Sequence, residues 1–429
     1  MKIGLIGNMN NNNFALMRYF RDLGVDAHLL LYSNDGEGTL SHFVPEADTW
    51  EIQRWASYIH QTSMPNDYIS AFDFPFSLAM GFRSLVRFHL RQIDQRHSSV
   101  SRSEILRAYS GYTFLVGSGV SPALLARVGY KLNIFYPYSI GVEFLGDSAW
   151  CHGLLSKPFL SRSFMKYASQ KQLRGIKLAS HVMVGDGYTK QMLDKLGVRS
   201  HLMAYPMVYN AEVIPDSPVS SSLQGIQATL LRSKLVVLHH SRLMWTKPDT
   251  YSELEWKRAS KNNHWFFKSL ARLVRDVPRL DVQALVCHYG PDVKPTKRLI
   301  ADLGIQDYVT WLPLLSRKEI LWLLSKVSLS IGEFYDMPHM LWGGAGWEAL
   351  AVGTPLIQGF NYTDYEFSSM YSMPPPPILP VSTEDHIYLH LLRAASGAYD
   401  LPRIRKESID WFNTYNGIGL ASQWLSLLS

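Results

Sequence analysis

The sequence predicts an α/β protein built from two Rossmann-like domains, each with a doubly wound parallel sheet. Near the N-terminus, a short apolar strand (2–6), a polar loop, a helical pattern (14–23) and a second strand (25–31) follow one another. A second series of this kind opens with the apolar run LVVL at 235–238. Between the two series, residues 205–233 are rich in proline and serine and lack periodicity, which is typical of a linker.

The length and composition fit this organisation. With 429 residues the chain can bury two separate cores, and we place the domains at 1–215 and 216–410. A hydrophobic content of 47% and a charged content of 18% are typical of globular proteins and exclude a disordered chain. The net charge of +6 is too small to indicate a nucleic-acid partner. It suits a nucleotide diphosphate or an anionic membrane surface, and ordinary solvated surface charge is the alternative.

The two cysteines, Cys151 and Cys287, lie far apart, with neither pairing nor metal-ligand spacing around them. We therefore expect no disulfide framework, no bound metal ion and a cytoplasmic location. The start MKIGLIG is too short to be a secretion signal, so we interpret it as a strand. Because no apolar stretch approaches the roughly 18 residues of a membrane span, any membrane contact would be peripheral.

The polar loop after the first strand reads GNMNNNN and lacks the later glycines of a dinucleotide-binding fingerprint. Its asparagines, Asn8 and Asn10 among them, fit either a turn with left-handed residues or a set of amide donors at the ligand-binding edge of the sheet. A later strand (131–138) ends in YPYSIGVEFLGD, which places Tyr138 and Glu143 at the same edge. Glu143 is the acid available there, as a catalytic group or as part of a structural ion pair.

Two segments of the first domain combine basic and apolar residues at helical spacing. In residues 82–96, Arg83, Arg87 and Arg91 recur at every fourth position beside apolar residues. Residues 159–178 form a second helix that is basic and aromatic. For the helix 82–96, a solvated face over a core-facing side is one interpretation. Contact with a lipid-linked or otherwise anionic acceptor at a membrane surface is the alternative.

The segment 328–359 combines a strand, a glycine-rich loop and the N-terminus of a helix. The loop ends in Gly343–Gly346, and the helix from Trp347 to Val352 carries one acid, Glu348. First-turn amides of a helix have no acceptor within it, and glycines let an anion approach the backbone. Taken alone, the pattern is typical of an ordinary turn, and phosphate contact at Gly344, Ala345 and Gly346 is the alternative.

The run WEALAVGTPLIQG, which contains this helix, resembles the donor-binding segment of GT-B glycosyltransferases, in the large retaining family that uses nucleotide-sugar donors (glycosyltransferase family 4). The resemblance implies two Rossmann-like domains that face a cleft, with Glu348 holding the donor ribose. It also implies that the apolar C-terminal helix, 411–429, packs back on the first domain. The first loop then faces the acceptor side, where we place Asn8, Asn10 and Tyr138.

Two cations of the second domain extend the resemblance. Arg242 follows the first strand of this domain, and Lys261 precedes a long apolar-periodic helix. Their order is similar to that of the pair with which the family holds the donor diphosphate. Such a pair stabilises the charge that builds on the leaving diphosphate as the glycosidic bond breaks. Lys247 is an alternative candidate for the second cation. Lys261 fits that role better, because a long helix follows Lys261.

One position departs from the family's pattern. The family carries an additional acid eight positions before the acid that corresponds to Glu348, and this chain has Met340 there. Glu333 and Asp336 lie upstream and are the acids that a shifted loop would bring into that place. The departure leaves the transferred sugar, and the activity itself, open.

Together these features predict a hexosyltransferase-type glycosyltransferase that moves a sugar, with retention, from a nucleotide-diphosphate sugar to an acceptor in bacterial surface-glycan synthesis. The acceptor is a glycan, a lipid-linked molecule or a protein. We expect no cofactor, no metal ion and no nucleic-acid partner, and a cytoplasmic enzyme with peripheral contact to the inner face of the membrane. Two alternatives stay open: a nucleotide-sugar 2-epimerase of the same fold, and a degenerate non-enzymatic subunit, which Met340 favours.

Overall fold

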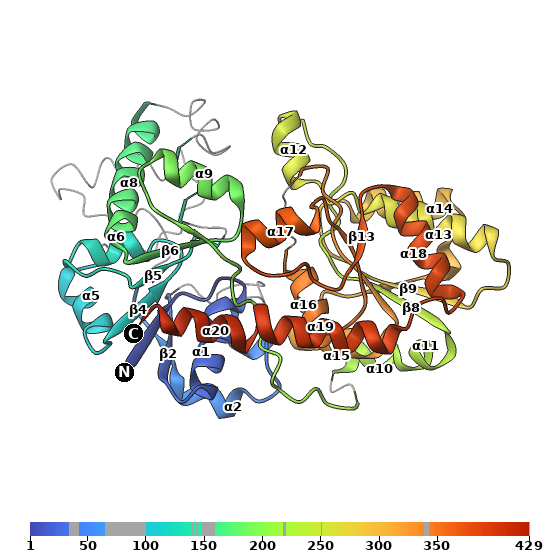
Figure 1. The fold of residues 1–429 in the computed structure, drawn as a ribbon, viewed down its shortest axis with the longest axis horizontal. Helices are drawn as coiled ribbons and strands as arrows, with labels where there is room; N and C mark the ends of the chain where they lie inside the picture. The colour runs from blue at the N-terminus through green and yellow to red at the C-terminus, as the bar shows by residue number, and fades with distance from the viewer. Residues whose placement is uncertain are drawn as a thin grey trace. The chain divides into compact units, whose positions relative to one another are not determined.

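The computed structural model describes residues 1–33, 43–64, 100–138, 141–142, 145–146, 159–217, 220–249, 251–338 and 343–428. The chain divides into two compact units, which the colour bar of Figure 1 locates by residue number. Unit 1 comprises Met1–Glu46, Trp50–Met207 and Leu420–Ser429, and unit 2 comprises Ala47–Thr49 and Val208–Gly419. Unit 2 thus includes three residues from the N-terminal part of the sequence, and unit 1 includes the C-terminus.

The described strands of unit 1 form one parallel sheet in the order β3-β2-β1-β4-β5-β6-β7. Their bounds are β1 Lys2–Ile6, β2 Asp26–Leu31, β3 Ile59–Gln61, β4 Phe114–Gly117, β5 Ile134–Phe135, β6 His181–Val184 and β7 His201–Leu202. The first strand, β1, is apolar and lies between β2 and β4. The strand order reverses at β1 and β4, and in doubly wound sheets ligands bind at such a point.

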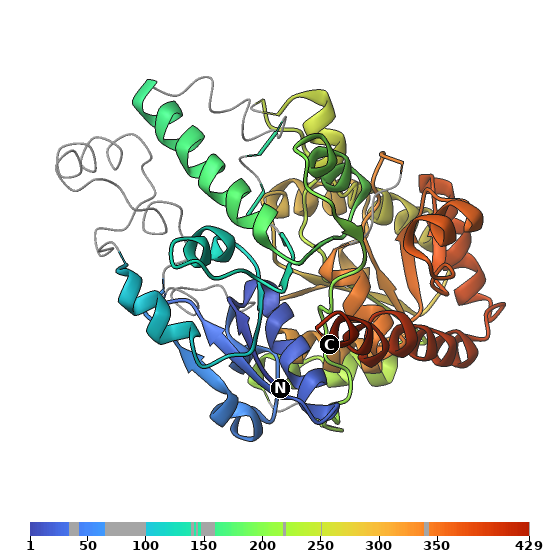
Figure 2. The same ribbon diagram turned by 60° about the vertical axis from the view of Figure 1, so that its left-hand side comes forward.

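The described α-helices of unit 1 are α1 Asn12–Asp22, α2 Ile52–Trp55, α5 Arg102–Tyr109, α6 Ser121–Ala126, α8 Phe159–Leu178 and α9 Gly187–Lys195. Helix α5 begins with a capping box in which Ser101 and Glu104 bind each other's backbone amides, and α9 begins at Asp186, whose carboxylate accepts from the amide of Thr189 at 2.8 Å. The long helix α8 packs against α6, as Figure 2 shows.

A glycine sets the distance between these two helices. At Gly175 in α8, an added Cβ would lie 2.2 Å from the carbonyl oxygen of Pro122 in α6. We expect Gly175→Ala to lower the free energy of unfolding by about 1–3 kcal/mol, because backbone atoms must move apart, and this outweighs the helix propensity that alanine adds. Urea unfolding would measure the change. Gly111→Ala is the matched control, since nothing lies within 4 Å of its Cβ position; equal effects of the two substitutions would contradict the prediction.

Unit 2 contains a second parallel sheet in the order β10-β9-β8-β11-β12-β13 within the described residues. Its strands are β8 Leu235–His239, β9 Val282–Cys287, β10 Val309–Leu312, β11 Leu329–Ile331, β12 Leu356–Gly359 and β13 Leu379–Val381. Strand β8 is buried along its whole length and pairs with β9 and β11. The strand order reverses at β8 and β11, which makes this edge the expected ligand site of unit 2.

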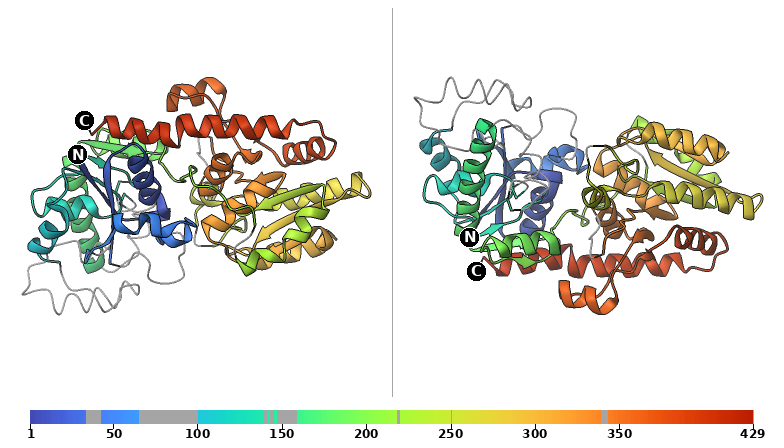
Figure 3. Two further views of the ribbon diagram at one scale, coloured as in Figure 1. Left: turned by 90° about the horizontal axis from the view of Figure 1, so that it is seen from below. Right: turned by 90° about the horizontal axis from the view of Figure 1, so that it is seen from above.

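The described α-helices of unit 2 cover both faces of this sheet. They are α10 Ser221–Gln224, α11 Gln227–Arg232, α12 Glu253–Ala259, α13 His264–Asp276, α14 Val293–Asp302, α15 Arg317–Lys326, α16 Gly344–Val352, α17 Asp364–Tyr371, α18 Glu384–Ala395, α19 Leu401–Tyr415 and α20 Ile418–Ser426, whose residues from Leu420 onward belong to unit 1. Helix α13 packs against α14 and α18, and α16 packs against α15 and α19 (Figure 3). Right-handed crossovers, which are the rule between parallel strands, would place these two groups on opposite faces of the sheet.

Short 3₁₀ helices complete the description: η1 Met9–Asn11, η3 Pro45–Ala47, η4 Ala56–Tyr58 and η5 Gln306–Tyr308. The predicted fold class is confirmed, because each unit carries a parallel sheet with helices on its faces. Two details differ from the prediction. The predicted linker, 205–233, contains α10 and α11, which its serines and prolines concealed, and α16 begins at Gly344 rather than at Trp347. The basic segment 82–96 lies outside the described residues.

The C-terminal residues pack within unit 1. The ring of Trp424 is fully buried and meets the ring of Tyr136 edge-on, with centroids 5.4 Å apart. Trp411, in α19, instead stacks on Trp347 of α16 inside unit 2, with centroids 6.2 Å apart. The segment 411–429 therefore contributes to the cores of both units.

Candidate functional site

The polar residues singled out in unit 2 gather where strands β8 and β11 end. Residues His240 and Arg242 follow β8, and Glu333 follows β11. Lys261 precedes α13, and Glu348 belongs to α16, the helix that follows β11. Because these elements meet at the carboxyl edge of the sheet, the residues lie at the point where the strand order reverses.

Lys261 is tied to the segment that follows β11. Its backbone amide donates to the carbonyl of Met244 at 2.7 Å, and its carbonyl accepts from the amide of Phe334 at 3.1 Å. Its ammonium group donates to the carboxylate of Glu333 and, at 3.3 Å, to the hydroxyl of Tyr335. Burial and the charge of nearby Arg242 lower the pKa of Lys261, whereas the Glu333 carboxylate opposes that shift by favouring the ammonium form.

Glu333 is the acid that the structure brings beside Lys261. Its carboxylate is buried and accepts from the hydroxyl of Tyr335 at 2.6 Å and from the amide of Gly343, the N-cap of α16, at 2.9 Å. A Cβ at Gly343 would lie 3.0 Å from this carboxylate, so glycine permits the contact. Asp336 is exposed, and Met340 lies outside the described residues.

Arg242 is exposed beside this pair, and among the described residues no acid pairs with it. The alternative cation, Lys247, forms an ion pair with Glu253 of α12. At the start of α16, the amide of Gly346 donates to the carbonyl of Gly343 at 3.2 Å. The amides of Gly344 and Ala345 have no acceptor in the described part of the chain. The structure thus offers one cation and two amides for an anion near Lys261.

Glu348 lies at the centre of a buried charge network. Its two carboxylate oxygens accept from Arg317 Nε at 2.9 Å and lie 3.1 Å from His240 Nε2. A second nitrogen of Arg317 donates to Asp48 at 3.0 Å. Burial alone would raise the pKa of Glu348, but the hydrogen bond with His240 and the charge of Arg317 outweigh it and hold the pKa below its ordinary value. Glu348 therefore stays a carboxylate at neutral pH.

Sequence reasoning missed three members of this network. His240 stands two residues before Arg242, and Arg317 begins α15, so their places after strands were the available signals. Asp48 comes from an aromatic-rich stretch without periodicity, and no local pattern marked it. Cys287, at the end of β9, is buried, and this burial together with the charge of Glu348 raises the pKa of its thiol to about 12. This thiol is therefore not a nucleophile at neutral pH.

In unit 1, the asparagine loop behaves largely as a structural turn. Asn8 is buried and donates to Asn11 at 2.6 Å and to the carbonyl of Phe43 at 2.8 Å, while its oxygen accepts from the amide of Phe14. Its amide therefore does not face a ligand. Asn10 has a φ of 53° and donates to the hydroxyl of Tyr138 at 3.3 Å. The structure brings Asn10 and Tyr138 together, whereas Glu143 lies outside the described residues.

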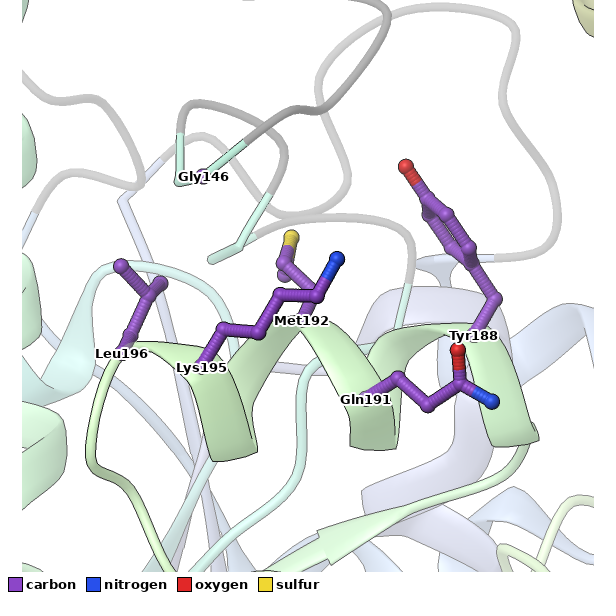
Figure 4. Close-up of a pocket in the computed structure, with 6 residues that line it drawn as sticks. All are labelled: Gly146, Tyr188, Gln191, Met192, Lys195 and Leu196. Atoms are coloured by element: carbon purple, nitrogen blue, oxygen red, sulfur yellow. The ribbon is translucent and has the colours of Figure 1, made fainter.

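A separate hollow of about 190 Å³ lies on α9 of unit 1. Figure 4 shows the labelled side chains on α9 and the turn at Gly146 across from that helix. They are Tyr188, Gln191, Met192, Lys195 and Leu196. The described residues that line it include one cation, Lys195, and neither an acid nor a histidine. No group of metal-ligating side chains occurs among the described residues, and no helix described here is long and apolar enough to span a membrane.

Two histidines beside the site, the buried His239 and the half-buried His264, make stability depend on pH. Burial lowers the pKa of His239 to about 3 and that of His264 to about 4. In the unfolded chain the two histidines take up protons near pH 6.5, whereas in the folded chain they do so at lower pH. Their contribution to the free energy of unfolding is therefore fully present above pH 6.5 and is lost as the pH falls toward 4. We expect urea unfolding to show a loss of up to about 1.4 kcal/mol per histidine and pH unit. His264→Asn should make the slope shallower; an unchanged slope would contradict the assignment.

Known proteins resemble this chain in structure. No protein-family model matches it, and no curated protein does. HepE of Anabaena, solved in complex with UDP-glucose, shares 14% of its residues, with a TM-score of 0.52 over 99% of this chain and 98% of that chain. The trehalose-6-phosphate synthase OtsA shares 11%, with a TM-score of 0.57 over 100% and 99% of the two chains.

A protein described as a UDP-N-acetylglucosamine 2-epimerase, from Listeria monocytogenes, also matches, with 11% identity and a TM-score of 0.52 over 99% of this chain and 95% of that chain. These likenesses show the fold. The chain has the two-Rossmann-domain GT-B architecture.

Proposed function

We propose that this protein is a glycosyltransferase that transfers a sugar from a nucleotide-diphosphate sugar to an acceptor. The observation that carries the proposal is the convergence of Arg242, Lys261 and the free amides of α16 at the reversal point of the unit 2 sheet. Cations and helix amides at this point suit a diphosphate. HepE, of the same fold, was solved with UDP-glucose, which supports a nucleotide-sugar donor here.

Each residue has a proposed role. Arg242 and Lys261 hold the diphosphate and stabilise the charge that it gains as the glycosidic bond breaks. The amides of Gly344 and Ala345 add to this anion site, and Glu348 accepts hydrogen bonds from the ribose hydroxyls. Glu333 serves in place of the family's acid, since this chain has Met340 at that position. The carboxylate of Glu333 faces the transferred sugar. The transfer retains the configuration of the sugar and needs neither metal ion nor cofactor.

On the acceptor side, we propose contact through Asn10 and Tyr138, and a catalytic role for Glu143. The acceptor is a glycan, a lipid-linked molecule or a protein in surface-glycan synthesis. The exposed cations of α8 support peripheral contact with an anionic membrane surface, since they are without acidic partners among the described residues. They are Lys166, Lys171, Arg174 and Lys177.

The proposal is tested by a thermal-shift panel of UDP, GDP, ADP and CMP. A ligand that binds only the folded state stabilises it by about 2.7 kcal/mol at one hundred times its Kd, so one diphosphate should raise the melting temperature clearly. No shift with any of the four would overturn the donor site and favour a degenerate subunit. Conversion of the matching nucleotide sugar in the absence of any acceptor would instead favour epimerase activity. The Listeria protein described as an epimerase has the same fold.

A further inference from the structure

We infer that Asp48 is a positioning residue of the donor site: it fixes the guanidinium of Arg317, and through it the carboxylate of Glu348, in the orientation that receives the ribose. The inference rests on the proposed function, because it concerns how the proposed ribose acid is held. Its basis is the chain of buried contacts that runs from Asp48 to Arg317 to Glu348.

The geometry makes Arg317 a bridge between two acids. Its Nη1 donates to Asp48 at 3.0 Å, and its Nε donates to Glu348 at 2.9 Å. The side chains of Arg317, Asp48 and Glu348 are 4%, 1% and 9% exposed, so bulk water screens their ion pairs little. A planar guanidinium held at both ends cannot rotate without breaking one of these bonds.

Glu348 can bind a ligand while this bridge is intact. Each carboxylate oxygen has two acceptor positions, and the contacts to Arg317 and His240 use one position on each oxygen. The remaining positions suit two neighbouring hydroxyls, as on a ribose. Their direction depends on the plane of the carboxylate, and this plane is set by Arg317 on one side and His240 on the other.

The segment that carries Asp48 is part of unit 2 and is held there by a hydrogen bond of its own. Ala47–Thr49 belong to this unit, and the hydroxyl of Thr49 donates to the carboxylate of Glu212 at 2.6 Å. Asp48 therefore has a defined place next to Arg317. Thr49 holds the same segment through its hydrogen bond to Glu212, so its substitution is a matched control for effects of the segment alone.

The test compares the affinity of the full chain for UDP and for 2′,3′-dideoxy-UDP, which lacks both ribose hydroxyls. Titration calorimetry should find that the wild-type protein binds UDP at least about tenfold more tightly, as expected for one or two hydrogen bonds to a charged group. In Asp48→Asn the affinity for UDP should fall toward that for the dideoxy form, whose own affinity stays unchanged. Thr49→Ala should keep the wild-type ratio.

The possible outcomes distinguish a failure of the role of Asp48 from a failure of the proposed function. A wild-type protein that binds none of the four nucleotides of the panel overturns the proposed function. A wild-type preference for UDP that persists in Asp48→Asn overturns the role of Asp48 alone. Equal loss of affinity for both nucleotides would show a structural effect and also overturn it.

A second variant keeps the inference testable if Asp48→Asn does not fold. Arg317→Lys retains the buried charge, but a single ammonium cannot hold two carboxylates in the fixed fork geometry of a guanidinium. The preference for UDP should fall in this variant too. An unchanged preference there would overturn the inference.

Discussion

Replacement of Arg317 by Met should lower the free energy of unfolding by about 3–5 kcal/mol, because it leaves the buried Asp48 and Glu348 without the cation that they share. Urea unfolding at pH 7 measures the loss. The difference from the wild-type protein should shrink as the pH falls toward 4, since protonation of the two acids removes the uncompensated charge.

An exposed arginine provides the control for this substitution. Arg403 pairs with Glu407 at 2.7 Å, but its side chain is 72% exposed. Arg403→Met should leave the free energy of unfolding nearly unchanged, because solvent screens this ion pair. Similar losses in the two variants, or a loss in Arg317→Met that does not depend on pH, would contradict the buried network.

The second large effect concerns ligand binding. Arg242→Ala should weaken the binding of the diphosphate that the thermal-shift panel selects by about 10- to 100-fold, since a hydrogen bond to a charged group contributes about 1.5–3 kcal/mol. The melting temperature of the free protein should stay unchanged, because Arg242 is exposed. Titration calorimetry at two salt concentrations would measure the loss and show that it is smaller at high salt.

Lys247 gives the matched comparison, because it is the other candidate for the second cation and is paired with Glu253. Lys247→Ala should leave the affinity for the diphosphate unchanged. If it weakens binding as much as Arg242→Ala does, the assignment of Lys261 as the partner of Arg242 is wrong.

Much of the fold was predictable because short patterns in the sequence determine the strands and helices. Apolar runs such as LVVL at 235–238 become buried strands, and the alternation of strands and helical patterns leaves a parallel sheet as the natural arrangement. The order of Arg242, Lys261 and the glycines before Glu348 was visible for the same reason. Each of them directly follows a strand or precedes a helix, and this fixes the edge of the sheet that it reaches.

The partners of these residues were not predictable, because they depend on contacts between distant segments. Glu348 was expected to face a ligand, but its neighbours Arg317, His240 and Asp48 come from three other places in the sequence. Asn8 illustrates the opposite case. Its position after a strand indicated a ligand contact, whereas the structure uses its amide to hold the carbonyl of Phe43. Position along the chain predicts where a side chain lies, but not what it binds.

The inclusion of Ala47–Thr49 in unit 2 has an evolutionary consequence. The unit is not contiguous in the gene, since Asp48 is encoded far from the residues that it holds. A recombination event that exchanged 208–419 as one block would bring in a new Arg317 and Glu348 and leave the old Asp48 behind. In the resulting proteins, the contact between positions 48 and 317 would depend on two distant stretches of the sequence rather than on one transferred block.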